Sequence, residues 1–156
     1  MAQRLMKLLD RFNEAGVIFS LTVMMVSVLI QVFARFFLDS APSWTEEMAR
    51  IFFVFSVAFG AGLAVKEGAY IFLDSVIHWF NPGMRSMINT TGKLIVLLVA
   101  IVMLAYSFKF VAIGTLETSP AMNINMGYVF TSMPIMAGMI SVYTLLSIKH
   151  KDKSPA

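Results

Sequence analysis

Four long apolar runs limit what this chain can fold into. The runs cover residues 15–37, 44–65, 87–113 and 126–148. A helix that crosses the hydrocarbon core of a bilayer takes about 20 residues, and each run is at least that long. Backbone polar groups in lipid must be satisfied within the segment, so each run predicts a helix. We therefore expect an all-α membrane protein with four transmembrane helices in one domain, residues 1–150, followed by a tail at 151–156.

Composition supports this class and excludes several others. Apolar residues are 58% of the 156 residues, charged residues are 13%, and mean hydropathy is +0.79, unlike a water-soluble domain. The net charge of +3 is dispersed beside the apolar runs, so we expect no nucleic-acid partner. Cysteine is absent, and His78 and His150 lie outside the runs. We therefore expect no cofactor, no metal site and no enzyme activity.

Residues 70–80 form a fifth apolar stretch that is too short to span. As a helix it would extend only about 16 Å. Its polar residues Asp74, Ser75 and His78 share one helical face, which is typical of a helix lying in the membrane interface. We expect a short interfacial amphipathic helix here, between the second and third spans.

The distribution of Lys and Arg predicts the orientation, because cytoplasmic loops retain these residues. The connections at 39–45 and 114–125 contain neither residue. The other flanking regions contain several, which predicts that both termini are cytoplasmic. The flanking cations are Arg4, Lys7, Arg11, Lys66, Arg85, Lys93, Lys149, Lys151 and Lys153.

The start of the second run is the most charged part of the chain at membrane depth. Glu46 and Arg50 are four residues apart, the spacing that pairs an acid and a base on one helix face. Two interpretations stay open: a charged helix start that also pairs with Arg35, or a cation or proton site at Glu46 or Glu47. This segment also contains Trp44, suited to the headgroup level, and the candidate N-caps Ser43 and Thr45.

Polar residues of the first run lie on one helical face, which we expect to point into protein. Arg35 lies at the end of this face, where it could reach Asp39 or the acidic pair of the second run. Packing or partner contact and a direct solute role both remain possible for it. The members of the face are Ser20, Met24, Ser27, Gln31 and Arg35.

Small residues recur at helical spacing in the second and fourth runs. In lipid such stripes let two helix backbones approach closely. Pro134 is expected to kink the fourth helix, because its ring removes a hydrogen bond. The stripes are Ser56, Gly60 and Ala64, with Ala61 and Gly62 beside them, and Gly127, Thr131, Pro134, Gly138 and Ser141.

Lys93 and Lys109 lie near the two ends of the third run, where both side chains are expected to snorkel toward water. Lys109 and Glu117 could instead contact an extracytoplasmic partner. No Asp, Glu or Lys lies at the middle of any run, and no run is broken there by a Gly and Pro pair. These absences argue against a complete transporter in this chain.

These residues together resemble the small membrane subunit, the Q subunit, of tripartite ATP-independent periplasmic (TRAP) transporters. The resemblance covers nearly the whole chain, although Tyr70 stands where the family often has His. Its signature lies in residues 35–37, 44–50, 59–61 and 66–71, with Asp74.

The resemblance implies a subunit of the bacterial inner membrane that supports a larger multispan subunit carrying the solute and sodium sites. A periplasmic solute-binding protein would dock on the outer face, and the substrate would be an organic acid such as a C4-dicarboxylate or a sialic acid. A self-sufficient, homo-oligomeric exporter or channel is the alternative. The candidate structural and partner-contact residues are Arg35, Trp44, Glu46, Glu47, Arg50, Gly60, Ala61, Asp74, Lys109 and Gly138.

Overall fold

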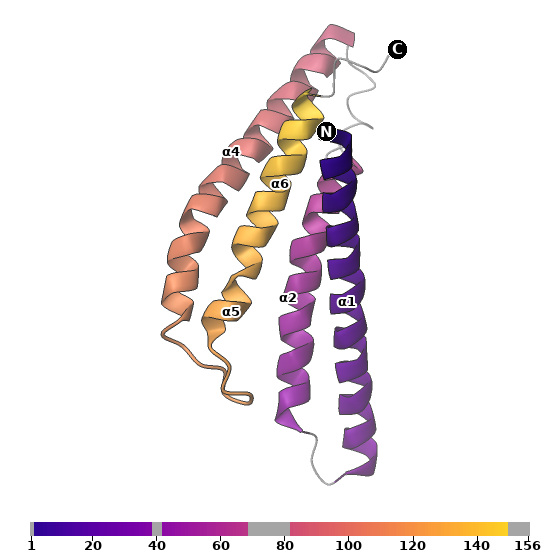
Figure 1. Ribbon diagram of the computed structural model, residues 1–156, viewed down its shortest axis with the longest axis vertical. Coiled ribbons are helices and arrows are strands. Elements are labelled where there is room, and N and C mark those ends of the chain that lie inside the picture. Colours follow the sequence, from indigo (N-terminus) through magenta and orange to yellow (C-terminus); the bar gives the residue numbers. More distant parts are fainter. Residues whose placement is uncertain (1, 39–41, 69–81, 150–156) are drawn as a thin grey trace.

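The computed structural model describes residues 2–38, 42–68 and 82–149 (Figure 1). These residues are helical apart from short connections and an isolated β-bridge between Thr118 and Asn125. The helices are α1 (Ala2–Phe37), α2 (Ser43–Lys66), α4 (Pro82–Gly114), α5 (Met126–Phe130) and α6 (Ser132–Lys149).

Within the described residues, four segments are long and apolar enough to cross a membrane, which confirms the four predicted spans. The described helices reach far beyond the predicted runs at two starts, because α1 begins at Ala2 and α4 begins at Pro82, and their other ends lie within one residue of the predicted bounds. The predicted interfacial helix at 70–80, with Asp74, lies outside the described residues. The four segments are Met6–Phe37, Ser43–Lys66, Met87–Gly114 and Met126–Ile148.

The helices form two hairpins that meet through α2 and α6. In the first hairpin α1 packs along α2, and in the second α4 packs against α5 and α6. The start of α1 and the end of α6 lie at one end of the molecule, which we call the terminal end (Figure 1). The α4 to α5 connection, residues 115–125, lies at the opposite end, which we call the loop end (Figure 1).

The fourth apolar segment is interrupted between α5 and α6 at Thr131. This interruption lies three residues before Pro134, the residue that was predicted to kink the fourth helix. Pro134 has no N–H to donate to the carbonyl of Phe130 one turn earlier, so the helical hydrogen-bond ladder has a gap where α5 ends.

The interior of the bundle is built from small side chains, and the large apolar ones face outward. This arrangement suits lipid, where close backbone approach replaces the hydrophobic effect between helices. Ser20 and Ser27 are buried, as expected for the polar face of the first span. The Ser27 hydroxyl donates to the Val23 carbonyl of its own helix at 2.8 Å. Other buried small residues are Ala34, Ser56, Ala58, Ala100, Ser107, Ser132, Ala137 and Ser141.

The closest helix approaches involve other glycines than Gly60 and Gly138. A Cβ on Gly62 would lie 2.8 Å from the Cβ of Met139, and one on Gly16 would lie 2.7 Å from the Phe59 ring. A Cβ on Gly60 would meet only Val17, at 3.9 Å, and one on Gly138 would meet nothing within 4 Å. Within the described residues the close approach of α2 is therefore at Gly62, on its buried face, and close approach at Gly60 and Gly138 stays a prediction for a partner helix.

Candidate functional site

The start of α2 is shaped by Pro42 and Thr45. Pro42 is the N-cap residue, with extended backbone (φ −63°, ψ 123°) and no side-chain capping bond. The buried Thr45 hydroxyl donates to the Pro42 carbonyl at 2.7 Å. The predicted N-cap at Ser43 or Thr45 is therefore wrong, because the helix begins one residue earlier and Thr45 acts as a donor instead of an acceptor.

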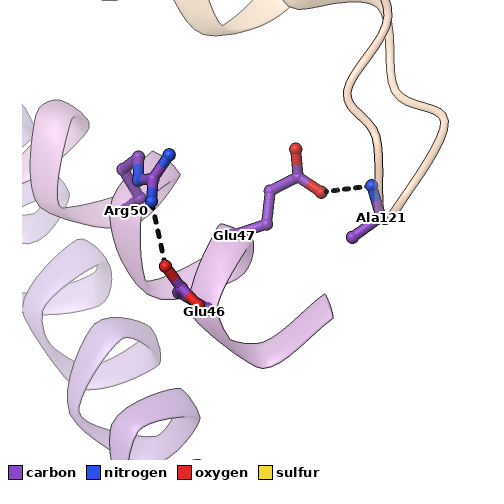
Figure 2. A network of polar contacts seen from close by, with 4 residues as sticks. All are labelled: Glu46, Glu47, Arg50 and Ala121. Carbon is purple, nitrogen blue, oxygen red and sulfur yellow. Dashed lines mark hydrogen bonds and ion pairs between the residues drawn. The ribbon is translucent and has the colours of Figure 1, made fainter. Parts of the chain in front are cut away.

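Glu46 and Arg50 form the predicted ion pair along one face of α2, at 3.0 Å between Oε1 and Nη2 (Figure 2). Their side chains are 64% and 74% exposed. An exposed pair of this kind contributes only about 0–1 kcal/mol to stability. The pair therefore places one negative and one positive side chain next to each other on the exposed surface of the first hairpin.

Arg35 is exposed near the end of α1. It forms no ion pair with any residue in the described ranges, so the expected pairing with Glu46 or Glu47 is wrong. Its other expected partner, Asp39, lies outside the described residues. Trp44, 41% exposed in the first turn of α2, is also presented outward.

Glu47 points away from that pair and toward the second hairpin (Figure 2). Its Oε2 accepts hydrogen bonds from the backbone amides of Ala121 at 3.1 Å and Met122 at 3.0 Å. Hydrogen bonds to an ionised acceptor are stronger than neutral ones. This contact, which we call the Glu47 contact, therefore joins α2 to the loop between α4 and α5.

The loop that receives Glu47 has its own ordered structure. The Asn125 side chain accepts from the Gly127 amide at 2.8 Å and donates to the Thr115 carbonyl at 2.9 Å. The buried Ser119 accepts from the Met122 amide at 3.3 Å, so this amide is shared with Glu47. The two amides offered to Glu47 are thus held in place before α5 begins.

An apolar groove lies between the hairpins near the loop end. We call it the inter-hairpin groove; its volume is about 610 Å³. Glu46, Glu47 and Arg50 supply its charged lining. The apolar lining includes Ile51, Val54, Phe110, Val129, Phe130 and Met133.

The hairpins are joined at the terminal end by four polar residues, which we call the terminal network. Lys66 of α2 pairs with Asp10 of α1, with 2.8 Å between Nζ and Oδ2. The Tyr143 hydroxyl of α6 donates to the other Asp10 oxygen at 2.8 Å. The Asn13 amide nitrogen of α1 donates to the same hydroxyl at 3.1 Å. Three helices therefore meet at one connected polar group.

Sequence reasoning missed the terminal network. The signal that could have found it is a cluster of polar residues at equal depth. Asp10 and Asn13 precede the first predicted run by a few residues, and Lys66 follows the second. Because both positions lie at the same membrane boundary, these side chains could have been expected to meet.

The two lysines of α4 differ in their surroundings. Lys93 donates to the Ser147 hydroxyl of α6 at 2.7 Å, a contact that the sequence did not predict, and its snorkelling stays a prediction. Lys109 is exposed near the loop end, and its ammonium lies 5.6 Å from the centre of the Tyr106 ring. Over residues 2–38, 42–68 and 82–149, no group of three or more His, Asp or Glu could hold a metal ion.

Comparison with known proteins decides the family. The model of the DctQ component of tripartite ATP-independent periplasmic transporters matches residues 24–153. The chain belongs to the DctQ family. The resemblance found in the sequence is therefore confirmed, and the protein is a TRAP transporter component with transmembrane helices.

Two relatives extend the DctQ assignment. The chain is 27% identical over 135 residues to a Haemophilus influenzae (strain Rd) protein that carries the name TRAP transporter small permease protein, covering 86% of this chain and 81% of the relative. It is 22% identical over 135 residues to the sialic acid TRAP transporter permease protein SiaT of Haemophilus influenzae (strain 86-028NP). That match covers 85% of this chain but only 21% of SiaT.

The DctQ match includes the Glu47 contact and Lys66, but it begins after Asp10 and Asn13. All ten candidate structural and partner-contact residues lie inside it. Among them, Glu46, Glu47 and Arg50 come together at the loop end, with Lys109 on the α4 side of the same end. Asp74 lies outside the described residues.

Proposed function

We propose that this chain is the small scaffold subunit of a TRAP transporter. It binds and stabilises a large multispan subunit that carries the solute and sodium sites. With a periplasmic solute-binding protein, the complex takes up an organic acid of the C4-dicarboxylate or sialic acid type. Both termini face the cytoplasm of a bacterium, and the chain crosses the inner membrane four times.

One observation carries this proposal. In SiaT, the region similar to this chain is about one fifth of a longer permease. The match covers 81% of the small permease relative, so in that protein the region makes up most of the chain. A region that is joined to a larger permease in SiaT and forms most of a small permease elsewhere is expected to work beside a large permease in both. The remaining four fifths of such a permease are where we place the solute and ion sites.

The arrangement of polar groups supports a scaffold. Glu47 is bonded to the loop of the second hairpin, and Asp10 is bonded to Lys66 and Tyr143. These groups hold helices to one another, and their hydrogen bonds stabilise the fold of the chain itself. Ionisable groups at membrane depth are costly, so a frame that pairs them internally is stable without a solute.

The outward faces support partner binding at membrane depth. The exposed side of α1 presents large apolar side chains that lipid or another membrane protein must cover. Arg35 and Trp44 add exposed groups at the loop end. We propose that partner contact uses this surface, with Gly60, Ala61 and Gly138 available for close approach by a helix of the large subunit.

Co-purification tests the proposal. The chain is expressed with a large TRAP permease subunit and isolated through a tag on the small chain. A one-to-one complex in mild detergent is expected. Recovery of the chain as a homo-oligomer without the large subunit would favour a self-sufficient exporter or channel instead.

A further inference from the structure

A second apolar groove runs along α4 near the loop end, and we call it the α4 groove. Its volume is about 420 Å³. Met103 and Ile113 mark its extent along α4, and these residues are about 15 Å apart as a helix. That length equals about half of the hydrocarbon core, the depth of one leaflet. The full lining is Met103, Tyr106, Ser107, Lys109, Phe110, Ile113 and Met133.

Lys109 is the one charged residue in the lining of this groove. It forms no ion pair with any residue of 2–38, 42–68 or 82–149. It lies five residues before the end of α4 at Gly114, or about 7.5 Å along the helix axis. A cation at this depth reaches toward the headgroups, where phosphate is the available anion. The nearby Tyr106 ring also suits the membrane interface.

The neighbouring inter-hairpin groove is less suited to an anion. Its charged lining is Glu46, Glu47 and Arg50, which together carry one net negative charge. Arg50 is already paired with Glu46, and Glu47 accepts two backbone hydrogen bonds. The two grooves share Phe110 and Met133 in their walls. The unpaired cation, Lys109, lines the α4 groove and does not line the inter-hairpin groove.

We propose that the α4 groove binds an anionic phospholipid of the leaflet at the loop end. The phosphate lies against the Lys109 ammonium, and one acyl chain lies along the apolar wall from Ile113 to Met103. A protein carboxylate alone would pair with Lys109 but would leave this apolar wall uncovered. A lipid supplies both the charge and the apolar length.

Native mass spectrometry of the full-length chain in detergent tests this site. The probes are phosphatidylglycerol and phosphatidylcholine with identical acyl chains. The wild-type chain is expected to retain one phosphatidylglycerol, about fivefold more strongly than phosphatidylcholine. Lys109→Gln is expected to lower phosphatidylglycerol retention to the phosphatidylcholine level, while Lys109→Arg keeps it.

Two further variants separate this site from general charge attraction. Arg35→Gln removes an exposed cation at the same end and is expected to leave retention unchanged. Met103→Trp fills the groove and is expected to lower retention of both lipids. Equal retention of the two lipids by the wild type, or equal losses in Arg35→Gln and Lys109→Gln, would overturn the proposal. Displacement of bound phosphatidylglycerol by an added large subunit would assign the groove to protein and overturn it as well.

Discussion

The Glu47 carboxylate lies 3.0 Å from the amide nitrogen of Met122, 75 residues away in the chain. This contact ties the first hairpin to the loop of the second at the loop end. The terminal network ties the same hairpins at the opposite end through Asp10 and Tyr143. Two polar contacts at opposite ends, with packing of α2 on α6 between them, fix the angle between the hairpins.

Glu47→Ala is expected to lower the free energy of unfolding by about 1–3 kcal/mol, because two backbone amides lose a charged acceptor. The local effect is measurable as faster hydrogen exchange at Ala121 and Met122. Glu47→Gln keeps an oxygen acceptor and should fall between the wild type and Glu47→Ala. Unchanged exchange in Glu47→Ala would show that the loop is held by its own bonds alone.

The pair of Asp10 and Lys66 is suited to a double-mutant cycle with Asp10→Asn, Lys66→Met and both together. Because the Lys66 side chain is 46% exposed, the coupling energy is expected to be about 0.5–1 kcal/mol. The equivalent cycle on Glu46 and Arg50, both more exposed, should give a smaller coupling. A larger value there would contradict this ranking of the two pairs.

Tyr143→Phe tests the centre of the terminal network. The Tyr143 side chain is buried, and its hydroxyl both donates to Asp10 and accepts from Asn13. Its removal is expected to destabilise the chain by about 1–3 kcal/mol, since buried polar groups are left unpaired. The measurement is thermal unfolding in detergent. Tyr128→Phe, on the exposed side of α5, is the matched control and should have little effect.

Gly62→Ala and Gly60→Ala compare two glycines on neighbouring faces of α2. The new methyl group at Gly62 would overlap the Met139 Cβ, so a loss of about 1–3 kcal/mol is expected. At Gly60 the methyl group has room and stability should hardly change. Equal effects on unfolding would mean that α2 packs on α6 through a different face.

Arg50→Ala is expected to weaken assembly with the large subunit more than it weakens substrate affinity. Arg50 is exposed on α2, is paired with Glu46 and lies in the lining of the inter-hairpin groove, where its charge is already neutralised by that pair. Co-purification yield and substrate affinity of the surviving complex are the two measurements. A normal yield with altered affinity would place Arg50 near the solute.

The features that could be predicted from the sequence are local ones. The length and hydropathy of each run suffice to predict the four spans, and the spacing of Glu46 and Arg50 suffices to predict their pair. The small-residue stripes of α2 were only partly predictable. Gly60 and Gly62 both lie in plausible stripes, and it is packing against Met139 that selects Gly62.

The contacts between hairpins could not be predicted in this way. Glu47 is one residue closer in sequence to Arg50 than Glu46 is, yet its partners are backbone amides 74 and 75 residues away. A backbone amide has no signature in the residue types around it. Tyr143 likewise finds Asp10 across 133 residues, which only the arrangement of three helices brings about.

The scaffold role is tested most directly by uptake into proteoliposomes driven by a sodium gradient. We predict no uptake of a C4-dicarboxylate or a sialic acid by the chain alone, and uptake when the large subunit and the solute-binding protein are both added. Uptake by the purified chain alone would contradict the scaffold role.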